Sequence, residues 1–93
     1  MRQVIVTTAH RDVWAGETNE DAEDGTIVLT QARHVFSWDA ETGGLGGLAA
    51  RGPGPKSRLS EPVTRARIRD VVTVLDCTPE ATERIRSAGW HRG

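Results

Sequence analysis

The segment formed by residues 25–39 constrains the fold most, because β-branched and aromatic residues are denser there than elsewhere in the chain. Ile27 and Leu29 share one parity along this segment. The opposite parity holds Ala32, Phe36 and Trp38. Successive side chains of a strand point to opposite faces, so the inward-facing row must change phase near Gln31, as it does at a β-bulge. The segment predicts one long bent strand, or two strands joined at a bend, in a small and strongly curved sheet.

Two further segments near the start of the chain have the composition of strands. Residues 4–8 read Val-Ile-Val-Thr-Thr, and β-branched side chains pack well on a pleated surface and poorly in a helix. Residues 13–18 predict the returning strand of a hairpin. The acidic residues 19–24 predict a solvated loop that an Asp24-Gly25 turn closes, so the first third of the chain predicts a three-stranded meander.

The middle of the chain is rich in glycine and proline. Residues 43–50 alternate small and apolar side chains, which fits a short buried strand or an irregular coil equally well. Residues 51–57 contain two prolines and two glycines in succession and predict a loop. Residues 66–77 predict a second long strand, because residues 71–75 are apolar on both parities, as in a strand covered on both faces.

A helix over residues 79–88 is predicted to cover one face of the sheet. Thr78 has the hydroxyl of an N-cap residue, and Pro79 suits the first helical position. Gly89 is expected to end the helix in the left-handed conformation, with Trp90 folded back onto Ile85 as in a Schellman motif. A buried Trp90 would then contribute much of the contact area that holds this narrow helix on the sheet.

These elements predict a single domain over residues 1–93 that is mostly β with one C-terminal helix, and therefore of the α+β class. Four or five short strands with tight turns indicate a small, strongly bent antiparallel sheet or a partly open barrel of the SH3-like or Sm-like type, an analogy that carries no function. A chain of this size buries only about 60 to 65% of its unfolded surface. We therefore expect assembly into a homo-oligomer to supplement a thin core.

The net charge of −1 excludes the strongly basic class of nucleic-acid binders, yet the charges are segregated along the chain. Residues 12–24 contain six acids and no base, whereas residues 51–69 contain six bases and one acid. Alternate residues of a strand project from one face, which suits contacts with an anionic ligand. The candidate ligand-binding residues are Arg51, Lys56, Arg58, Arg65, Arg67 and Arg69. The alternative is a solvated face that pairs with the acidic loop, within one chain or between copies.

The sequence contains no catalytic or metal-binding pattern. His10, His34 and His91 lack metal-ligand spacing, and Cys77 at the end of an apolar strand is more typical of a small buried residue than of a nucleophile. The loop over residues 54–57 fails as a phosphate-binding loop, because prolines remove the backbone donors that such a loop needs. We therefore expect no catalytic residue, no metal and no cofactor, and a protein that is not an enzyme.

The chain also lacks membrane and export signals. No apolar stretch approaches the roughly 20 residues that span a bilayer. The first residues have neither the apolar run nor the cleavage site of a signal peptide, and a single cysteine cannot form an intrachain disulfide. These features predict a reduced, cytoplasmic protein without a membrane role.

Short motifs are spread over nearly the whole chain. They are Val4-Ile5-Val6-Thr7-Thr8, His10-Arg11, Val13, Gly16, Ala32-Arg33, Trp38, Gly47-Leu48-Ala49, Gly52-Pro53, Asp70-Val71, Thr78-Pro79-Glu80-Ala81 and Trp90. Together they resemble a family of small uncharacterised proteins of tailed bacteriophages and prophages. Asp12 departs from that pattern, since a glycine commonly follows the His-Arg pair.

The resemblance implies an accessory phage protein that acts in the host cytoplasm. The first hypothesis is a non-enzymatic, oligomeric binding module of the host-takeover or anti-defence type, which sequesters a host protein or an anionic nucleotide or nucleic-acid ligand. The second hypothesis is a structural virion component, such as a capsid decoration or a ring-forming assembly protein. The resemblance provides no catalytic residues.

Overall fold

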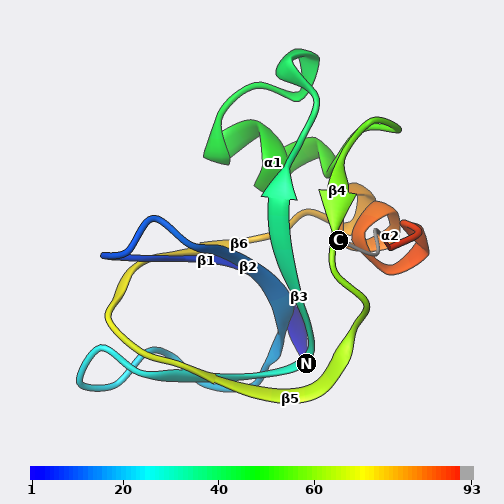
Figure 1. Cartoon of the computed structure of the whole chain (residues 1–93). Coiled ribbons are helices and arrows are strands. Elements are labelled where there is room, and N and C mark those ends of the chain that lie inside the picture. Colours follow the sequence, from blue (N-terminus) through cyan, green and yellow to red (C-terminus); the bar gives the residue numbers. More distant parts are fainter. Residues whose placement is uncertain (91–93) are drawn as a thin grey trace.

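The structure is a computed structural model that describes residues 1–90. Within these residues six strands form one antiparallel sheet, accompanied by two α-helices and one short 3-10 helix (Figure 1). The strands are β1 (Arg2–Thr8), β2 (Val13–Thr18), β3 (Ile27–Ser37), β4 (Arg58–Leu59), β5 (Val63–Ile68) and β6 (Val71–Asp76). The helical elements are η1 (Ala40–Thr42), α1 (Leu45–Arg51) and α2 (Pro79–Ser87).

The sheet is strongly bent but not closed. Its strand order is β4-β3-β2-β1-β6, and β5 pairs with β3. The first half of β3, from Ile27 to Ala32, pairs with β5, whereas its second half pairs with β4. Since β5 and β6 do not pair within the described residues, the sheet stays open between them, although a short turn links the two strands. The predicted class, mostly β with a C-terminal helix around a bent antiparallel sheet, is confirmed.

The predicted change of phase near Gln31 is confirmed as a β-bulge. Ala15 lies opposite Arg33 and Glu17 lies opposite Thr30, so β3 has one residue more than β2 in this interval. Gln31 has a positive φ of 49°. Such a bulge bends the strand and re-aims the side chains around it.

The inward row beyond the bulge agrees only in part with the predicted one. Ala32 is buried in the same core as Ile27 and Leu29, as predicted, whereas Phe36 is 52% exposed, and Arg33 and Val35 of the other parity are buried. Trp38 packs only partly against the core.

The strand β1 is buried on both faces, and each face has its own hydrophobic core. Val4 and Val6 pack on one side with apolar residues of β3 and β5. Ile5 packs on the other side, where α1 and α2 contribute Leu48 and Ile85. The β-branched composition of this strand suits burial on both faces.

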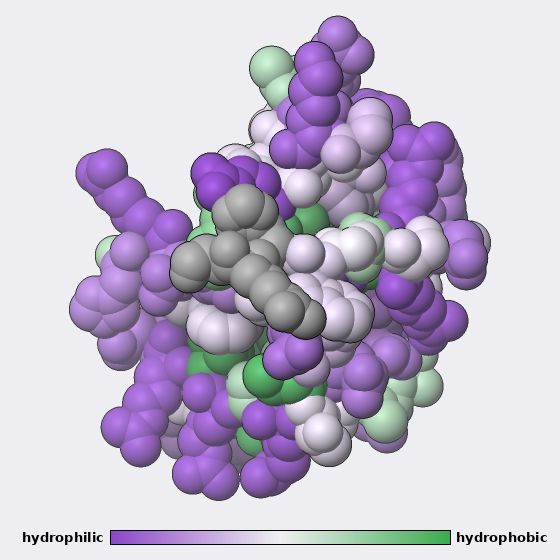
Figure 2. Space-filling model, turned by 45° about the vertical axis from the view of Figure 1, so that its right-hand side comes forward, coloured by the Kyte–Doolittle hydropathy of each residue, from purple (hydrophilic) through white to green (hydrophobic). Residues whose placement is uncertain are grey.

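In the view of Figure 2, hydrophilic side chains cover most of the visible surface, with hydrophobic side chains in limited areas between them.

Residues 45–51 form the helix α1, so the strand or coil predicted over residues 43–50 is wrong. Leu45, Leu48 and Ala49 follow the spacing i, i+3, i+4 of a helical face, and Leu48 and Ala49 are buried in the core. Gly47 is required by packing, because a Cβ at this position would overlap the carbonyl oxygen of Thr42. Gly47 therefore permits a close approach between α1 and η1.

The single strand predicted over residues 66–77 is also wrong, because a turn divides it into β5 and β6. Asp70 adopts a positive φ of 56° in this turn, and its carboxylate oxygen Oδ2 lies 2.9 Å from Nε2 of His10. The backbone N–H of Ala9 donates to the carbonyl of Asp70 at 2.9 Å. The segment 71–75 is not covered throughout, since Val72 is 67% exposed.

The helix α2 begins as predicted but ends differently. The hydroxyl of Thr78 accepts a hydrogen bond from the N–H of Ala81 at 3.1 Å, which confirms the N-cap. At the other end, Ala88 is extended and Gly89 has no positive φ, so the predicted left-handed ending is wrong. Trp90 is 50% exposed rather than buried. Within residues 1–90 no helix has both the length and the apolar character needed to cross a bilayer.

Candidate functional site

The structure separates the six predicted ligand-binding residues into two groups. Arg65 and Arg67 are exposed on one face of β5, where they lie opposite Thr30 and Val28 of β3. Arg69 is also exposed but follows the strand in the turn toward β6. The prediction of alternating arginines on one strand face therefore holds for Arg65 and Arg67.

The other three basic residues lie around the opposite half of β3. Arg51 ends α1 and donates from Nη2 to the carbonyl oxygen of Thr42 at 2.8 Å. Arg58 is on β4, which pairs with the second half of β3, and Lys56 lies in the preceding loop. Figure 1 shows α1 and β4 at the end of the molecule opposite β5. Arg51, Lys56 and Arg58 thus do not share a surface with Arg65 and Arg67.

The acidic loop lies beside β5 in the same chain. Glu20 and Arg65 line one hollow of about 280 Å³, and the Glu20 carboxylate accepts a hydrogen bond from the N–H of Val28 at 3.3 Å. Asp21 pairs with Arg2 at 2.9 Å. Part of the acidic loop therefore lies beside Arg65 within one copy, and the exposed Asp21–Arg2 pair stabilises the fold by at most about 1 kcal/mol.

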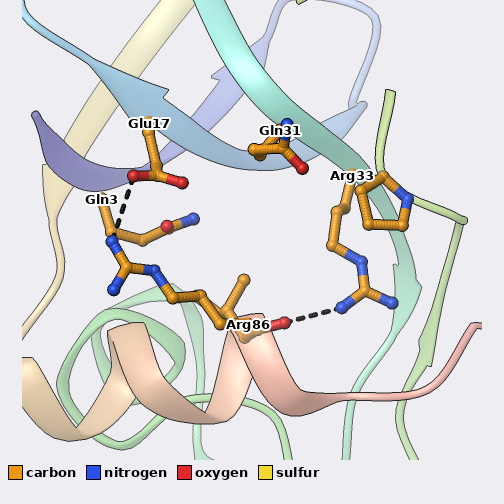
Figure 3. Close-up of a pocket in the computed structure, with 7 residues that line it drawn as sticks. Gln3, Glu17, Gln31, Arg33 and Arg86 are labelled. Atoms are coloured by element: carbon orange, nitrogen blue, oxygen red, sulfur yellow. Dashed lines mark hydrogen bonds and ion pairs between the residues drawn. The ribbon is translucent and has the colours of Figure 1, made fainter. Parts of the chain in front are cut away.

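A second hollow of about 270 Å³ lies between the sheet and α2, and it is more enclosed than the hollow beside Arg65 (Figure 3). Its wall takes polar side chains from β1, β2 and β3 and apolar contacts from Pro62 and Ile85. We call it the glutamine pocket, lined by Gln3, Glu17, Gln31, Arg33, Pro62, Ile85 and Arg86. None of these residues was predicted from the sequence as a site residue.

Strand register explains why these polar side chains meet. Gln3 of β1 lies opposite Glu17 of β2. Two residues further along β1, Ile5 lies opposite Ala15, and this pair belongs to the core beneath the helices. The bulge then brings Gln31 of β3 to the same pocket. A polar row thus continues the apolar row on the face that α2 covers. The sequence signal was a glutamine at the head of a buried strand, on the same parity as Ile5.

Gln3 is the most informative residue of the pocket. Its side chain is only 5% exposed, and within residues 1–90 its amide makes no hydrogen bond. No fully enclosed side-chain polar atom lacks a partner in the described part, so the amide must reach the water of the pocket. Buried polar groups are normally paired, and leaving one unpaired costs about 1 to 3 kcal/mol. Gln3 therefore offers a donor and an acceptor to whatever occupies the pocket.

Arg33 forms the inner wall and is 2% exposed. It donates four hydrogen bonds, all to neutral backbone carbonyls: to Ser60 at 2.9 Å from Nε, to Ile85 at 2.6 Å and Ala88 at 2.8 Å from Nη1, and to Gly89 at 2.9 Å from Nη2. Three of these acceptors are at the C-terminal end of α2, where the helix dipole favours a cation. Burial lowers the pKa of Arg33 from its ordinary value. Arg33 thus replaces the glycine ending that the sequence predicted.

An ion pair spans the outer part of the pocket. Nη2 of Arg86 donates to Oε1 of Glu17 at 3.0 Å, joining the last turn of α2 to β2 (Figure 3). Glu17 also lines the hollow that contains Arg65, so the two hollows adjoin at this carboxylate. The glutamine pocket therefore combines two neutral amides, one paired acid and two arginines.

The chemically reactive residues lie outside both hollows. Burial, with a smaller contribution from the adjacent Asp76 carboxylate, raises the pKa of Cys77 to about 11, so this thiol stays protonated near neutral pH. His34 lies between Trp14 and Phe36, with ring centroids 4.9 and 4.6 Å away. Residues 1–90 contain no cluster of three potential metal ligands. His91 lies outside the described residues.

Comparison with known proteins assigns the chain to a family without assigning an activity. No curated protein and no solved structure matches it. A family model described as a domain of unknown function (DUF6948) matches residues 1–85, which include both hollows and all of their lining residues except Arg86. The chain therefore belongs to the family of this domain of unknown function, DUF6948.

Proposed function

We propose that this protein is a small, non-enzymatic binding module that holds an anionic ligand of the nucleotide class at the glutamine pocket and the neighbouring Arg65. The observation that carries the proposal is the side-chain amide of Gln3, a residue that is only 5% exposed, because this amide makes no hydrogen bond within residues 1–90 and opens onto the pocket. An unpaired polar group in this position stabilises a complex when a ligand completes its hydrogen bonds.

The arginines of β5 support the anionic part of the proposal. Arg65 and Arg67 are exposed, and within residues 1–90 neither forms an ion pair. A guanidinium presents donors in a fork that matches phosphate oxygens. Since the hollow of Arg65 adjoins the glutamine pocket at Glu17, one ligand can occupy both.

Binding without catalysis is supported by the residues that line the pocket. The described residues that line it include no histidine, cysteine, serine or threonine, so this part of the lining lacks the usual nucleophile and base of covalent catalysis. The one carboxylate, Glu17, is held by Arg86. Together with the resemblance to small phage proteins, this supports an accessory role in the host cytoplasm, where the protein would sequester its ligand as a takeover or anti-defence factor.

Titration calorimetry with AMP, GMP, CMP and UMP tests the proposal. We expect saturable binding of at least one nucleotide, weakened by at least fivefold in the Arg65→Ala/Arg67→Ala double variant. Lys56→Ala is the matched control, because it removes an exposed charge near the opposite half of β3. Absence of binding by all four nucleotides at millimolar concentration refutes the proposed function.

A second candidate, a structural component that assembles from copies of this chain, is favoured by the edge strand β6. Within residues 1–90 this strand pairs only with β1, and Val72 on it is 67% exposed. An exposed apolar edge is a template for pairing with another chain. A homo-oligomer in light scattering that Val72→Lys dissociates, together with the protein's presence in purified virions, would favour this candidate over sequestration.

A further inference from the structure

We propose that the glutamine pocket receives the base of the nucleotide, which the amides of Gln3 and Gln31 bind along its polar edge, while the phosphate stays outside on Arg65. This inference rests on the proposed function. It adds the orientation of the ligand and a ligand-binding role for two glutamines that the sequence did not single out.

The size of the pocket favours one ring system rather than a whole nucleotide. Sites for drug-sized ligands measure about 300 to 1,000 Å³. The glutamine pocket measures about 270 Å³ and adjoins the hollow beside Arg65, which measures about 280 Å³. A ligand with two chemically distinct parts therefore fits best with one part in each hollow.

The charges of the wall decide which part enters the glutamine pocket. Arg33 directs four N–H groups to backbone carbonyls, which leaves little of its fork for a phosphate. Arg86, the other arginine of the wall, is already paired with Glu17 at 3.0 Å, so neither arginine presents a free fork to a phosphate. The interior is therefore suited to a neutral polar group, and the phosphate is left to the exposed Arg65.

The two glutamines provide the hydrogen bonds that a base requires. Each carboxamide has an acceptor oxygen beside a donor nitrogen, the pattern with which glutamine binds adenine bidentately. Ile85 and Pro62 supply apolar contacts for the ring. The same donor and acceptor pair matches the edges of other bases, so the pocket should bind bases as a class and distinguish poorly among them.

The test separates the base from the phosphate by using AMP, adenosine and ribose 5-phosphate as probes in titration calorimetry. We expect adenosine to bind and ribose 5-phosphate to fail to displace it. Gln3→Met removes the amide and keeps the shape, and we expect it to weaken adenosine and AMP equally, by about tenfold, the discrimination typical of a bidentate contact. Arg65→Ala should weaken AMP and leave adenosine unchanged.

Stability provides an independent readout. Since the amide of Gln3 has no partner in the described chain, Gln3→Met should leave the melting temperature unchanged or raise it. A structural role for Gln3 would instead lower it. Should Gln3→Met fail to fold, that result overturns the ligand-binding role of Gln3, and Gln31→Met, at a more exposed position, tests the pocket alone.

The failures of the two proposals are distinguishable. Binding of AMP with equal affinity by wild type, Gln3→Met and Gln31→Met overturns the orientation but leaves the proposed function standing. Binding of ribose 5-phosphate as tightly as AMP does the same, because it places the recognised group outside the pocket. Absence of binding by AMP and the other three nucleotides refutes both.

Discussion

Replacing Arg33 by methionine should remove a large share of the stability of this domain. The side chain of methionine fills a similar volume but cannot donate to the four carbonyls that Arg33 contacts at Ser60, Ile85, Ala88 and Gly89. A typical hydrogen bond contributes about 1 kcal/mol to folding, so the loss should be about 4 kcal/mol. The total stability of a domain of this length is about 5 to 14 kcal/mol.

Urea denaturation followed by tryptophan fluorescence measures this loss. With a slope of about 1 to 3 kcal/mol per M, the midpoint of unfolding should fall by about 1.3 to 4 M. Arg86→Met is the matched control, because it removes another arginine that joins α2 to the sheet, and the partly exposed ion pair of Arg86 with Glu17 contributes about 1 kcal/mol. Arg33→Lys keeps the charge without the planar fork and should fall between the two. A stability for Arg33→Met within 1 kcal/mol of that for Arg86→Met would refute the assignment of Arg33 as the residue that ends α2.

Three further predictions concern packing, the cysteine and the C-terminal tryptophan. Gly47→Ala should destabilise the fold by about 1 to 3 kcal/mol, because the new Cβ would overlap Thr42, whereas Gly46→Ala, where the space is open, should stabilise the fold by up to about 1 kcal/mol. Equal melting temperatures for the two variants would contradict this packing. The pKa of Cys77 is raised in the folded chain from its ordinary value of 9.0 to about 11, so the contribution of this thiol to stability is complete below pH 9 and is lost as the pH rises toward 11. Urea midpoints across this range should fall more for wild type than for Cys77→Ala, and parallel curves would refute the shift. Trp90→Ala should melt within a few degrees of wild type because the indole is half exposed, and a loss near 3 kcal/mol would show instead that the ring is part of the core.

The predictions that came true from sequence rest on interactions between near neighbours. The strands over residues 4–8 and 13–18 follow from β-branched composition. The start of α2 follows from Thr78, whose hydroxyl accepts a hydrogen bond from the N–H of Ala81 three residues later. The bulge near Gln31 follows from a change of parity within one strand. Patterns of this kind are complete within a short window of the chain.

The predictions that failed depend on residues far apart in the sequence. Gly46 and Gly47 weaken an isolated helix, and α1 exists because its apolar face packs on the core. The division between β5 and β6 places a non-glycine residue, Asp70, at a positive φ, and there Asp70 contacts Ala9 and His10, about 60 residues earlier. The end of α2 depends on Arg33, which is more than 50 residues away in the sequence.

The glutamine pocket could not be predicted for the same reason. Its polar side chains come from three strands and one helix, and apart from Gln31 and Arg33 on β3 these side chains are far apart in the sequence. The register that aligns Gln3 with Glu17 is set by the β1–β2 hairpin, and the position of Gln31 is set by the bulge. The arginines of β5 were visible in sequence because alternation within a strand is a local pattern.

Nuclear magnetic resonance of the side-chain amides tests the central claim most directly. The chain contains two glutamines, Gln3 and Gln31, and one asparagine, Asn19, so three pairs of amide signals report on the two hollows. Titration with AMP should shift both glutamine pairs along a single saturable curve, and titration with adenosine should shift the same two pairs. Glutamine signals that stay in place while AMP binds, or that do not respond at any concentration of either ligand, would contradict the account.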